Sequence, residues 1–231
     1  SASVLRLSNS AGFITRKRID NVHEAVKIIG LRNLNMILVA SSARNIMTTR
    51  YSAFKEIWSH CNKAAFYARQ IALGNGYDKL AEHAFLAGLL HDLGKIVLLS
   101  TTARLAEWIS DFTRNREMST STVLEEISIG MSHSTIGARI AEKWNLPHYV
   151  IESIRHHHSP LNAEPAFADI VRISYLANAL CGIENGRYDF AMIEEDVLEA
   201  FDINGEERFS AFHAGLRDKF EEHNAVISNA S

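Results

Sequence analysis

The sequence predicts an all-α protein, a stacked bundle of helices. Only three prolines occur in 231 residues, and apolar residues recur at spacings of three and four along almost the whole chain. This is the pattern of amphipathic helices. Hydrophobic residues make up 47% of the chain and charged residues 22%, an ordinary globular composition. A chain of this length can form one domain with a real core, or two small packed lobes.

We expect residues 1–50 to form an N-terminal helical lobe, truncated at its start because the chain begins within helical-looking sequence. Asp20 is a suitable cap for a short helix that Gly30 ends, and a second helix is expected from Leu31 to about Met47. This lobe carries no reactive group of residues, and its polar side chains are expected to be solvated.

Further helices are expected along the rest of the chain. The first runs from Ser52 to Leu73 and carries His60 beside its apolar face, and the second runs from Lys79 to Leu90 and leads into His91 and Asp92. The others are expected over residues 96–115, 123–144 with a break at Gly130, 147–158 with Pro147 in the first turn, 165–180, 189–201 and 206–224.

Composition argues against several classes of function. The net charge is −3 and no basic run exceeds Arg16–Arg18, so a surface for duplex nucleic acid is not expected. No apolar stretch approaches the ~20 residues of a membrane span. Cys61 and Cys181 have no CxxC partner, which favours buried thiols in a reducing cytoplasm over disulfides or a cysteine zinc site.

The stretch from Gly88 to Lys95 carries the strongest chemical signal. An apolar run leads directly into His91, Asp92 and Lys95, and ionisable groups are rarely buried unless they are paired or bound to a metal. The alternative is an ordinary helix C-terminus, with Gly94 as the C-cap and His91 and Lys95 complementing the helix dipole.

Four predicted helices end near residues of the metal-ligand type. These are His60; His91 with Asp92; His133; and His157 with His158. Imidazole and carboxylate together suit one or two ions of Fe, Mn, Zn or Ni. Spacing alone does not establish that the residues meet, so ordinary histidines on helix surfaces stay an alternative. His156 should project to another side of its helix.

Several stretches together resemble the HD-related output domain (HDOD) family, the regulatory branch of the HD superfamily of metal-dependent phosphohydrolases. They are residues 4–10, 25–30, 88–95, 133–137 (HSTIG), 144–147 (WNLP) and 157–160 (HHSP). The resemblance implies a single domain with an N-terminal lobe over residues 1–50, an HD-like helical core over 51–185 and C-terminal helices over 186–231.

The resemblance also implies roles for individual residues. His60, His91 and Asp92 match the metal-holding residues of the superfamily, Lys95 matches a lysine that contacts phosphate, and His133, His157 and His158 match extra ligands of the HD-GYP phosphodiesterase branch. The distal aspartate is replaced by Asn178, a weaker ligand without charge. Ser159-Pro160-Leu161 stands where a Gly-Tyr-Pro segment would follow, so phosphodiester hydrolysis becomes doubtful while metal binding stays plausible.

Our leading hypothesis is therefore a cytoplasmic bacterial signalling module that acts through protein contacts, with a degenerate HD site that senses a metal or nucleotide. Its expected partners are signalling proteins and a nucleotide or phosphate ligand, and homodimer formation stays open. The rival is a metal-dependent phosphohydrolase with Asp92 and Lys95 as catalytic residues, in which a metal lowers the pKa of the attacking water. A third hypothesis is a scaffold whose histidines bind nothing.

The remaining conspicuous residues are expected to be structural. Trp58, Trp108 and Trp144 are expected in the core. His23, His83, His148, His213 and His223 show no partner pattern and are expected at the surface.

Overall fold

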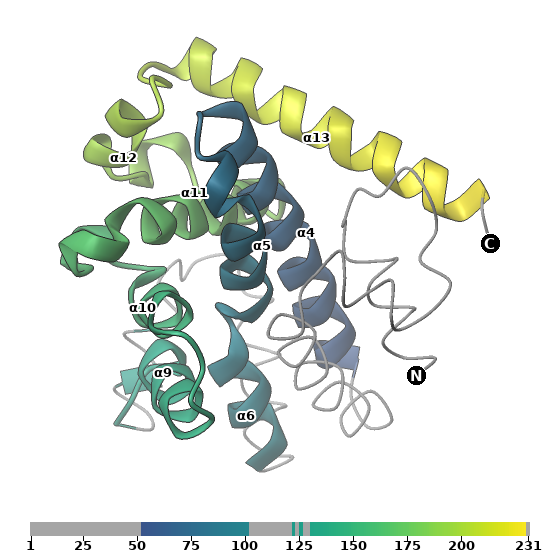
Figure 1. Ribbon diagram of the computed structural model, residues 1–231. Coiled ribbons are helices and arrows are strands. Elements are labelled where there is room, and N and C mark those ends of the chain that lie inside the picture. Colours follow the sequence, from purple (N-terminus) through teal and green to yellow (C-terminus); the bar gives the residue numbers. More distant parts are fainter. Residues whose placement is uncertain (1–51, 102–121, 123–124, 127–129, 230–231) are drawn as a thin grey trace.

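A computed structural model describes residues 52–101, 122, 125–126 and 130–229, and the described part is helical, without a strand (Figure 1). The expected N-terminal lobe, Trp108 and His23 lie outside these residues. The α-helices are α4 (Ser52–Gly74), α5 (Ala81–Leu90), α6 (Leu93–Thr101), α9 (His133–Lys143), α10 (His148–His156), α11 (Ala168–Glu184), α12 (Glu195–Ala200) and α13 (Glu206–Asn229). Short 3-10 turns occur at η1 (Asp78–Leu80), η2 (Pro160–Asn162), η3 (Pro165–Phe167) and η4 (Phe190–Met192). The predicted all-α class is confirmed.

Helix α5 lies at the centre of the fold, packed against α4, α10 and α11. Every residue from Ala84 to Leu90 is buried, as expected of a helix that is apolar on all sides. Its close approach to α4 depends on Gly88, where an added Cβ would lie 2.8 Å from the carbonyl oxygen of Ala64. This packing brings the C-terminal end of α5, and therefore His91 and Asp92, into the interior.

Helices α6 and α9 touch backbone to backbone at a pair of glycines. A Cβ on Gly94 would lie 1.8 Å from the carbonyl oxygen of His133 and 2.9 Å from the amide nitrogen of Gly137. No side chain fits such a gap. Since Gly94 follows Asp92 by two residues, the contact sets His133 next to Asp92. Gly94 therefore serves close packing, and not as the helix cap that the alternative interpretation of the sequence gave it.

Three expected helices begin or run differently in the structure. The break expected in the helix over residues 123–144 is real, because Gly130 has φ +78° and α9 starts only at His133. There the Ser132 side chain accepts a hydrogen bond from the Thr135 amide, a standard N-cap. Pro147 precedes α10 as its N-cap. Residues 189–201 form η4 and the short α12, separated by extended backbone at Ile193.

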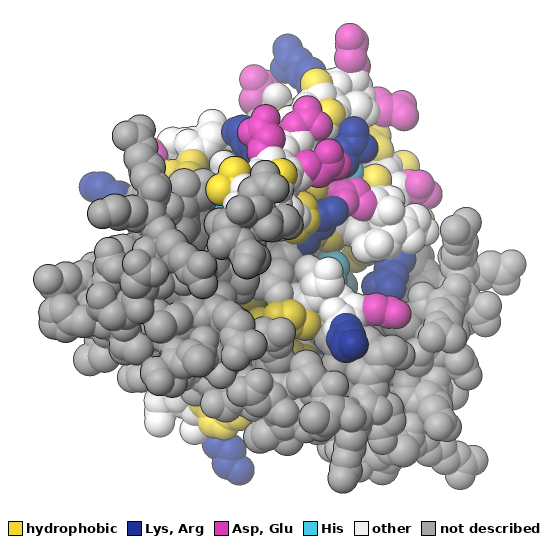
Figure 2. All heavy atoms as spheres, turned by 90° about the vertical axis from the view of Figure 1, so that its right-hand side faces the viewer, with side chains coloured by type: hydrophobic (Ala, Val, Ile, Leu, Met, Phe, Trp, Pro, Cys, Tyr) yellow, Lys and Arg dark blue, Asp and Glu magenta, His cyan; other side chains and the backbone are white. Residues whose placement is uncertain are grey.

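Most of the structural side chains lie where they were expected. Cys61 and Cys181 are buried free thiols, and Trp58 is half-buried against the core. Trp144 contradicts its prediction, because it is 44% exposed at the C-terminal end of α9. On the face shown in Figure 2, the described acidic and basic side chains are interspersed.

Within the described residues, one segment is long and apolar enough to cross a membrane, Pro165–Glu184. Its most apolar window is 67% buried inside the fold, because α11 packs against α4, α5 and α10. Burial among other helices is the behaviour of a core helix, whose apolar surface is covered by protein.

A buried polar group holds the last helix, α13, to α4 and α11. The Glu184 carboxylate accepts hydrogen bonds from Tyr67 Oη (2.5 Å) and His213 Nε2 (2.9 Å) and forms an ion pair with Lys63. His213 is therefore not the unpartnered surface histidine that was expected. Burial alone would raise the pKa of Glu184, but hydrogen bonds from Lys63, Tyr67 and His213 lower it below its usual value.

Candidate metal centre

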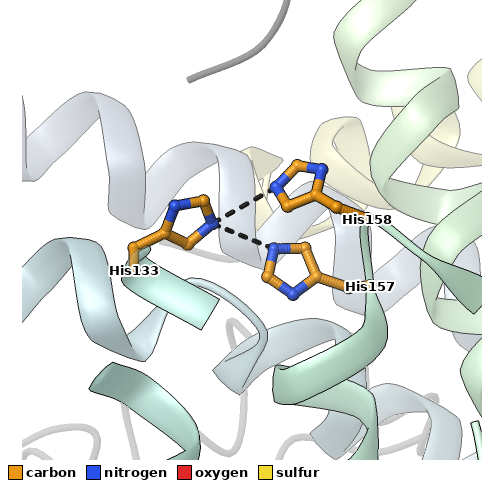
Figure 3. A group of neighbouring side chains, drawn as sticks. All are labelled: His133, His157 and His158. Carbon is orange, nitrogen blue, oxygen red and sulfur yellow. Dashed lines mark hydrogen bonds between the residues drawn. The ribbon is translucent and has the colours of Figure 1, made fainter. Parts of the chain in front are cut away.

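The fold brings all the predicted ligand residues together. His60 comes from α4, His91 and Asp92 from the end of α5, His133 from the start of α9, His157 and His158 from the end of α10, and Asn178 from α11. The side chains of His91, Asp92, His133 and His157 are almost completely buried. Figure 3 shows His133, His157 and His158 pointing toward one another.

The centre has two halves, and the first surrounds one oxygen of Asp92. His60, His91 and Asp92 form one group whose ligand atoms lie within 4.8 Å of one another. The Nε2 atoms of His60 and His91 are 3.2 Å apart and lie 3.8 and 3.5 Å from Asp92 Oδ2. Asn178 Oδ1 is 3.0 Å from His60 Nε2, so it completes this half with an uncharged oxygen.

The second half surrounds the other oxygen of Asp92. His133 Nε2 lies 3.1 Å from His157 Nε2 and 3.2 Å from His158 Nε2 (dashed lines in Figure 3). Asp92 Oδ1 is 3.3 Å from His133 Nε2 and 3.6 Å from His157 Nε2. One carboxylate therefore contacts both groups, which is the arrangement that can bridge two neighbouring metal ions.

Backbone and carboxylate acceptors determine which imidazole nitrogens carry protons. The Nδ1 atoms of His91 and His157 each lie 2.7 Å from a carbonyl oxygen, those of Gly88 and Ile154. Each carbonyl oxygen accepts a hydrogen bond from Nδ1–H. In the neutral ring this leaves Nε2 unprotonated, with a free lone pair. Orientation of ligand histidines through the second ring nitrogen is a regular feature of metal sites.

His133 is oriented in the same way by Glu125, which the sequence analysis missed. Glu125 Oε2 accepts hydrogen bonds from both Nδ1 and the backbone amide of His133, each at 2.7 Å, and Glu125 is only 4% exposed. A glutamate eight residues before a histidine carries no recognisable spacing signal. Only its location next to apolar Leu124 hinted that it is buried.

The centre therefore gathers acceptors that have no proton to share. The Nε2 atoms of His133 and His157 and Asp92 Oδ1 are all acceptors, and they lie 3.1 to 3.6 Å from one another. Among the described residues, Asp92 Oδ1 accepts no hydrogen bond of good geometry, and its cationic neighbour is the Lys95 ammonium, 3.0 Å away. Such lone pairs repel one another unless a cation lies between them. The donor set, imidazole with carboxylate, fits a divalent ion such as Zn, Fe, Mn or Ni.

Four of the histidines, His60, His91, His157 and His158, are neutral at physiological pH, as metal ligands must be. Burial lowers the pKa of His60 to about 3 and the pKa values of His91 and His157 to about 4. Burial also holds the pKa of His158 well below its usual value. For Asp92, burial alone would raise the pKa, but Lys95 and the surrounding histidines bring it well below the usual value, so the carboxylate stays charged.

Lys95 belongs to the centre. Its Nζ lies 3.0 Å from each carboxylate oxygen of Asp92, so it is not a solvated lysine at a helix end. His156 lies apart from the seven predicted ligand residues, as expected, and contacts Glu152 and Ser159. Of the histidines expected at the surface, His148 is exposed, whereas His83 and His223 are half-buried against Tyr149 and Phe66.

Fold and site together define a helical domain with a histidine-rich, aspartate-bridged centre. The sequence family described as "HDOD domain" matches residues 1–160. Because this is more than half of the chain, the protein belongs to the HDOD family, and the predicted resemblance is confirmed.

A curated relative matches almost the whole chain. An uncharacterized protein of Treponema pallidum (strain Nichols) is 29% identical over 218 residues, which are 94% of this chain and 42% of that protein. The chain thus spans less than half of this curated relative.

Two solved structures share the fold. A presumed phosphohydrolase of Shewanella amazonensis SB2B matches with a TM-score of 0.67 and 20% identity, over 100% of this chain and 82% of the other. A presumed signal transduction protein of Marinobacter aquaeolei VT8 matches with a TM-score of 0.73 and 21% identity, over 98% of this chain and 51% of the other.

Proposed function

We propose that the chain is a signalling domain whose His/Asp centre holds a divalent metal and which acts on other proteins through contacts. The observation that carries the metal site is the close approach of three lone-pair atoms, His133 Nε2, His157 Nε2 and Asp92 Oδ1, which lie 3.1 to 3.6 Å apart. Membership of the HDOD family and the fold shared with the Marinobacter protein support the signalling role.

The roles of the residues follow from their surroundings. Asp92 bridges the two halves, and Lys95 neutralises part of its charge from 3.0 Å away. His60, His91 and Asn178 would hold a metal in the first half, and His133, His157 and His158 in the second. Asn178 contributes no negative charge, which weakens the first half relative to a site with a second carboxylate. We therefore propose that the centre binds metal but does not hydrolyse phosphate esters rapidly.

Metal-dependent phosphohydrolysis is the second candidate function, because one carboxylate contacts both halves of the centre. A bound divalent ion supplies an activated water at neutral pH. Lys95 would then turn from Asp92 toward a phosphate oxygen. Asp92 would hold the two halves of the centre next to each other. The Shewanella protein with the same fold is described in these terms, and this function likewise stays a proposal.

Metal analysis of the purified protein tests the proposal. We expect about one or two Fe, Mn, Zn or Ni ions per chain, and the variant Asp92→Ala should lose them. Asp218→Ala, which removes an exposed aspartate of α13, should keep them. Circular dichroism checks that each variant is folded.

Turnover separates the two functions. With metal bound, the signalling domain should release no phosphate from phosphodiesters or nucleotides, whereas a hydrolase should do so and lose activity in Asp92→Ala. Wild-type protein that is metal-free after gentle purification would contradict both versions of the centre. Contacts with protein partners, or between two copies of the chain, would then be the remaining basis for a signalling role.

A further inference from the structure

A second group of ligand-type side chains lies on the outer side of α10. His148, Glu152 and His156 follow one another at intervals of four residues, so they lie along one face of the helix. Glu164, from the segment between η2 and η3, approaches the same face. Ligand atoms of His148, Glu152 and Glu164 lie within 4.8 Å of one another.

Glu152 is the central residue of this group. It is only 4% exposed, although carboxylates are rarely buried without compensation. Its Oε2 accepts a hydrogen bond from the Glu164 amide (3.2 Å) and lies 3.8 Å from His156 Nε2. His148 Nδ1 lies 3.9 Å from Glu164 Oε2. One imidazole and two carboxylates therefore face one small volume, and His156 adjoins it through its contact with Glu152.

The local charge favours a cation. Arg155 is the cationic partner recorded for Glu152, at 3.6 Å, but its guanidinium pairs more closely with Glu142. Two carboxylates, Glu142 and Glu152, thus share one guanidinium, while His148 and Glu164 are both 56% exposed.

We propose that this group is a second metal site, separate from the centre around Asp92, that takes a borderline divalent ion such as Zn²⁺. A histidine with two carboxylates, and a second histidine next to Glu152, suits Zn²⁺, whereas Mg²⁺ and Ca²⁺ prefer oxygen ligands alone. A bound ion would fasten the segment before η3 to α10. That segment directly follows His157 and His158, so the ion would stabilise the chain that carries two residues of the main centre.

Zinc binding by variants of the full chain tests this site. Equilibrium dialysis with Zn²⁺ should give one equivalent fewer for His148→Ala/Glu164→Gln than for wild type. Because both side chains are exposed, the double variant should fold normally. The matched control Glu199→Gln, an exposed glutamate on α12, should keep the wild-type count.

A variant of the main centre keeps the two sites distinguishable. His158→Ala should lower the count independently, and its combination with His148→Ala/Glu164→Gln should give additive losses. Co²⁺ provides a second readout, because its visible absorption reports coordination by nitrogen and oxygen. An unchanged Zn²⁺ count in His148→Ala/Glu164→Gln, or no Zn²⁺ bound by the wild type beyond the main centre, would overturn the second site and leave the proposed function untouched.

Discussion

At the residue scale, the centre depends on groups that set the direction of its ligands. Glu125 is the clearest example, because it is buried and accepts two hydrogen bonds from His133. A carboxylate at this position orients the imidazole and makes its Nε2 lone pair more basic. Glu125 would therefore support the candidate metal centre through His133.

Replacing this carboxylate tests its role. Glu125→Gln should weaken metal binding by roughly 10- to 100-fold and leave the helical circular dichroism unchanged, since glutamine keeps the shape. Competition with a chromophoric chelator measures the affinity. Its exposed neighbour offers a matched control, and Glu126→Gln should bind like wild type. Equal affinities for both variants would remove Glu125 from the centre.

A substitution at Asn178 is expected to strengthen metal binding, whereas Glu125→Gln should weaken it. Its Oδ1 is 3.0 Å from His60 Nε2, so Asn178→Asp would place a negative charge in the first half of the centre. We expect metal affinity to rise about tenfold or more, because affinity grows with the charge of the ligand set. The same titration measures it, with exposed Asn162→Asp as the control. An affinity equal to wild type would mean that Asn178 does not contact the ion.

At the scale of elements, the two close backbone contacts decide where the ligands lie. Gly94→Ala would put a methyl group 1.8 Å from the His133 carbonyl oxygen, so α6 and α9 would have to separate. We expect a loss of on the order of 3 kcal/mol in the free energy of unfolding, together with loss of bound metal.

The matched control is Gly215→Ala in α13, where an added Cβ meets no atom within 4 Å among the described residues. It should gain about 0.5 to 1 kcal/mol, since alanine favours helices over glycine. Urea unfolding measures both variants. A Gly94→Ala protein as stable as wild type would show that α6 and α9 separate easily.

The elements also show how far the sequence could lead. Periodicity predicted α4 and α13 to within a few residues at their described ends, because long amphipathic helices repeat one signal many times. It failed for residues 189–201, where η4 and α12 are too short to establish a period. Trp144 was placed in the core because it is large and apolar. In fact it lies at the end of α9, where no further helix covers it fully.

The residues of the candidate centre were predicted from a family motif, whereas their proximity in space could not be predicted from the sequence. Spacing along the chain says nothing about distances in space, and resemblance supplied the grouping of His60, His91, His133, His157 and His158. The roles of Glu125, Gly94 and Gly137 depend on tertiary contacts, so the sequence alone does not reveal them. Their roles become visible once α6 and α9 are in contact.

At the scale of the whole molecule, burial of neutral histidines makes stability depend on pH. The folded-state pKa values of His60, His91 and His157 are about 3, 4 and 4, below the usual value near 6.5. As pH falls below about 6.5, the unfolded chain takes up protons that the native state excludes, so stability decreases until the folded-state values are reached.

Each such histidine should cost the metal-free protein roughly 1.4 kcal/mol per pH unit in this window. Urea unfolding with excess chelator, between pH 7 and pH 5, measures the slope. Carboxylates contribute little there, because the pKa values of Asp92 and Glu184 are lowered and these groups titrate below the window. Stability independent of pH over this range would contradict the neutral, buried state of the histidines.

The side chains that meet at the centre come from points as far apart as His60 and Asn178, 118 residues away along the chain. An ion shared by such distant groups acts as a removable cross-link, and a cross-link that closes a long loop restricts the unfolded chain strongly. It would keep α4, α5, α9, α10 and α11 assembled for as long as the ion stays. The lifetime of the folded domain, and hence its resistance to proteolysis, would then follow the supply of metal around it.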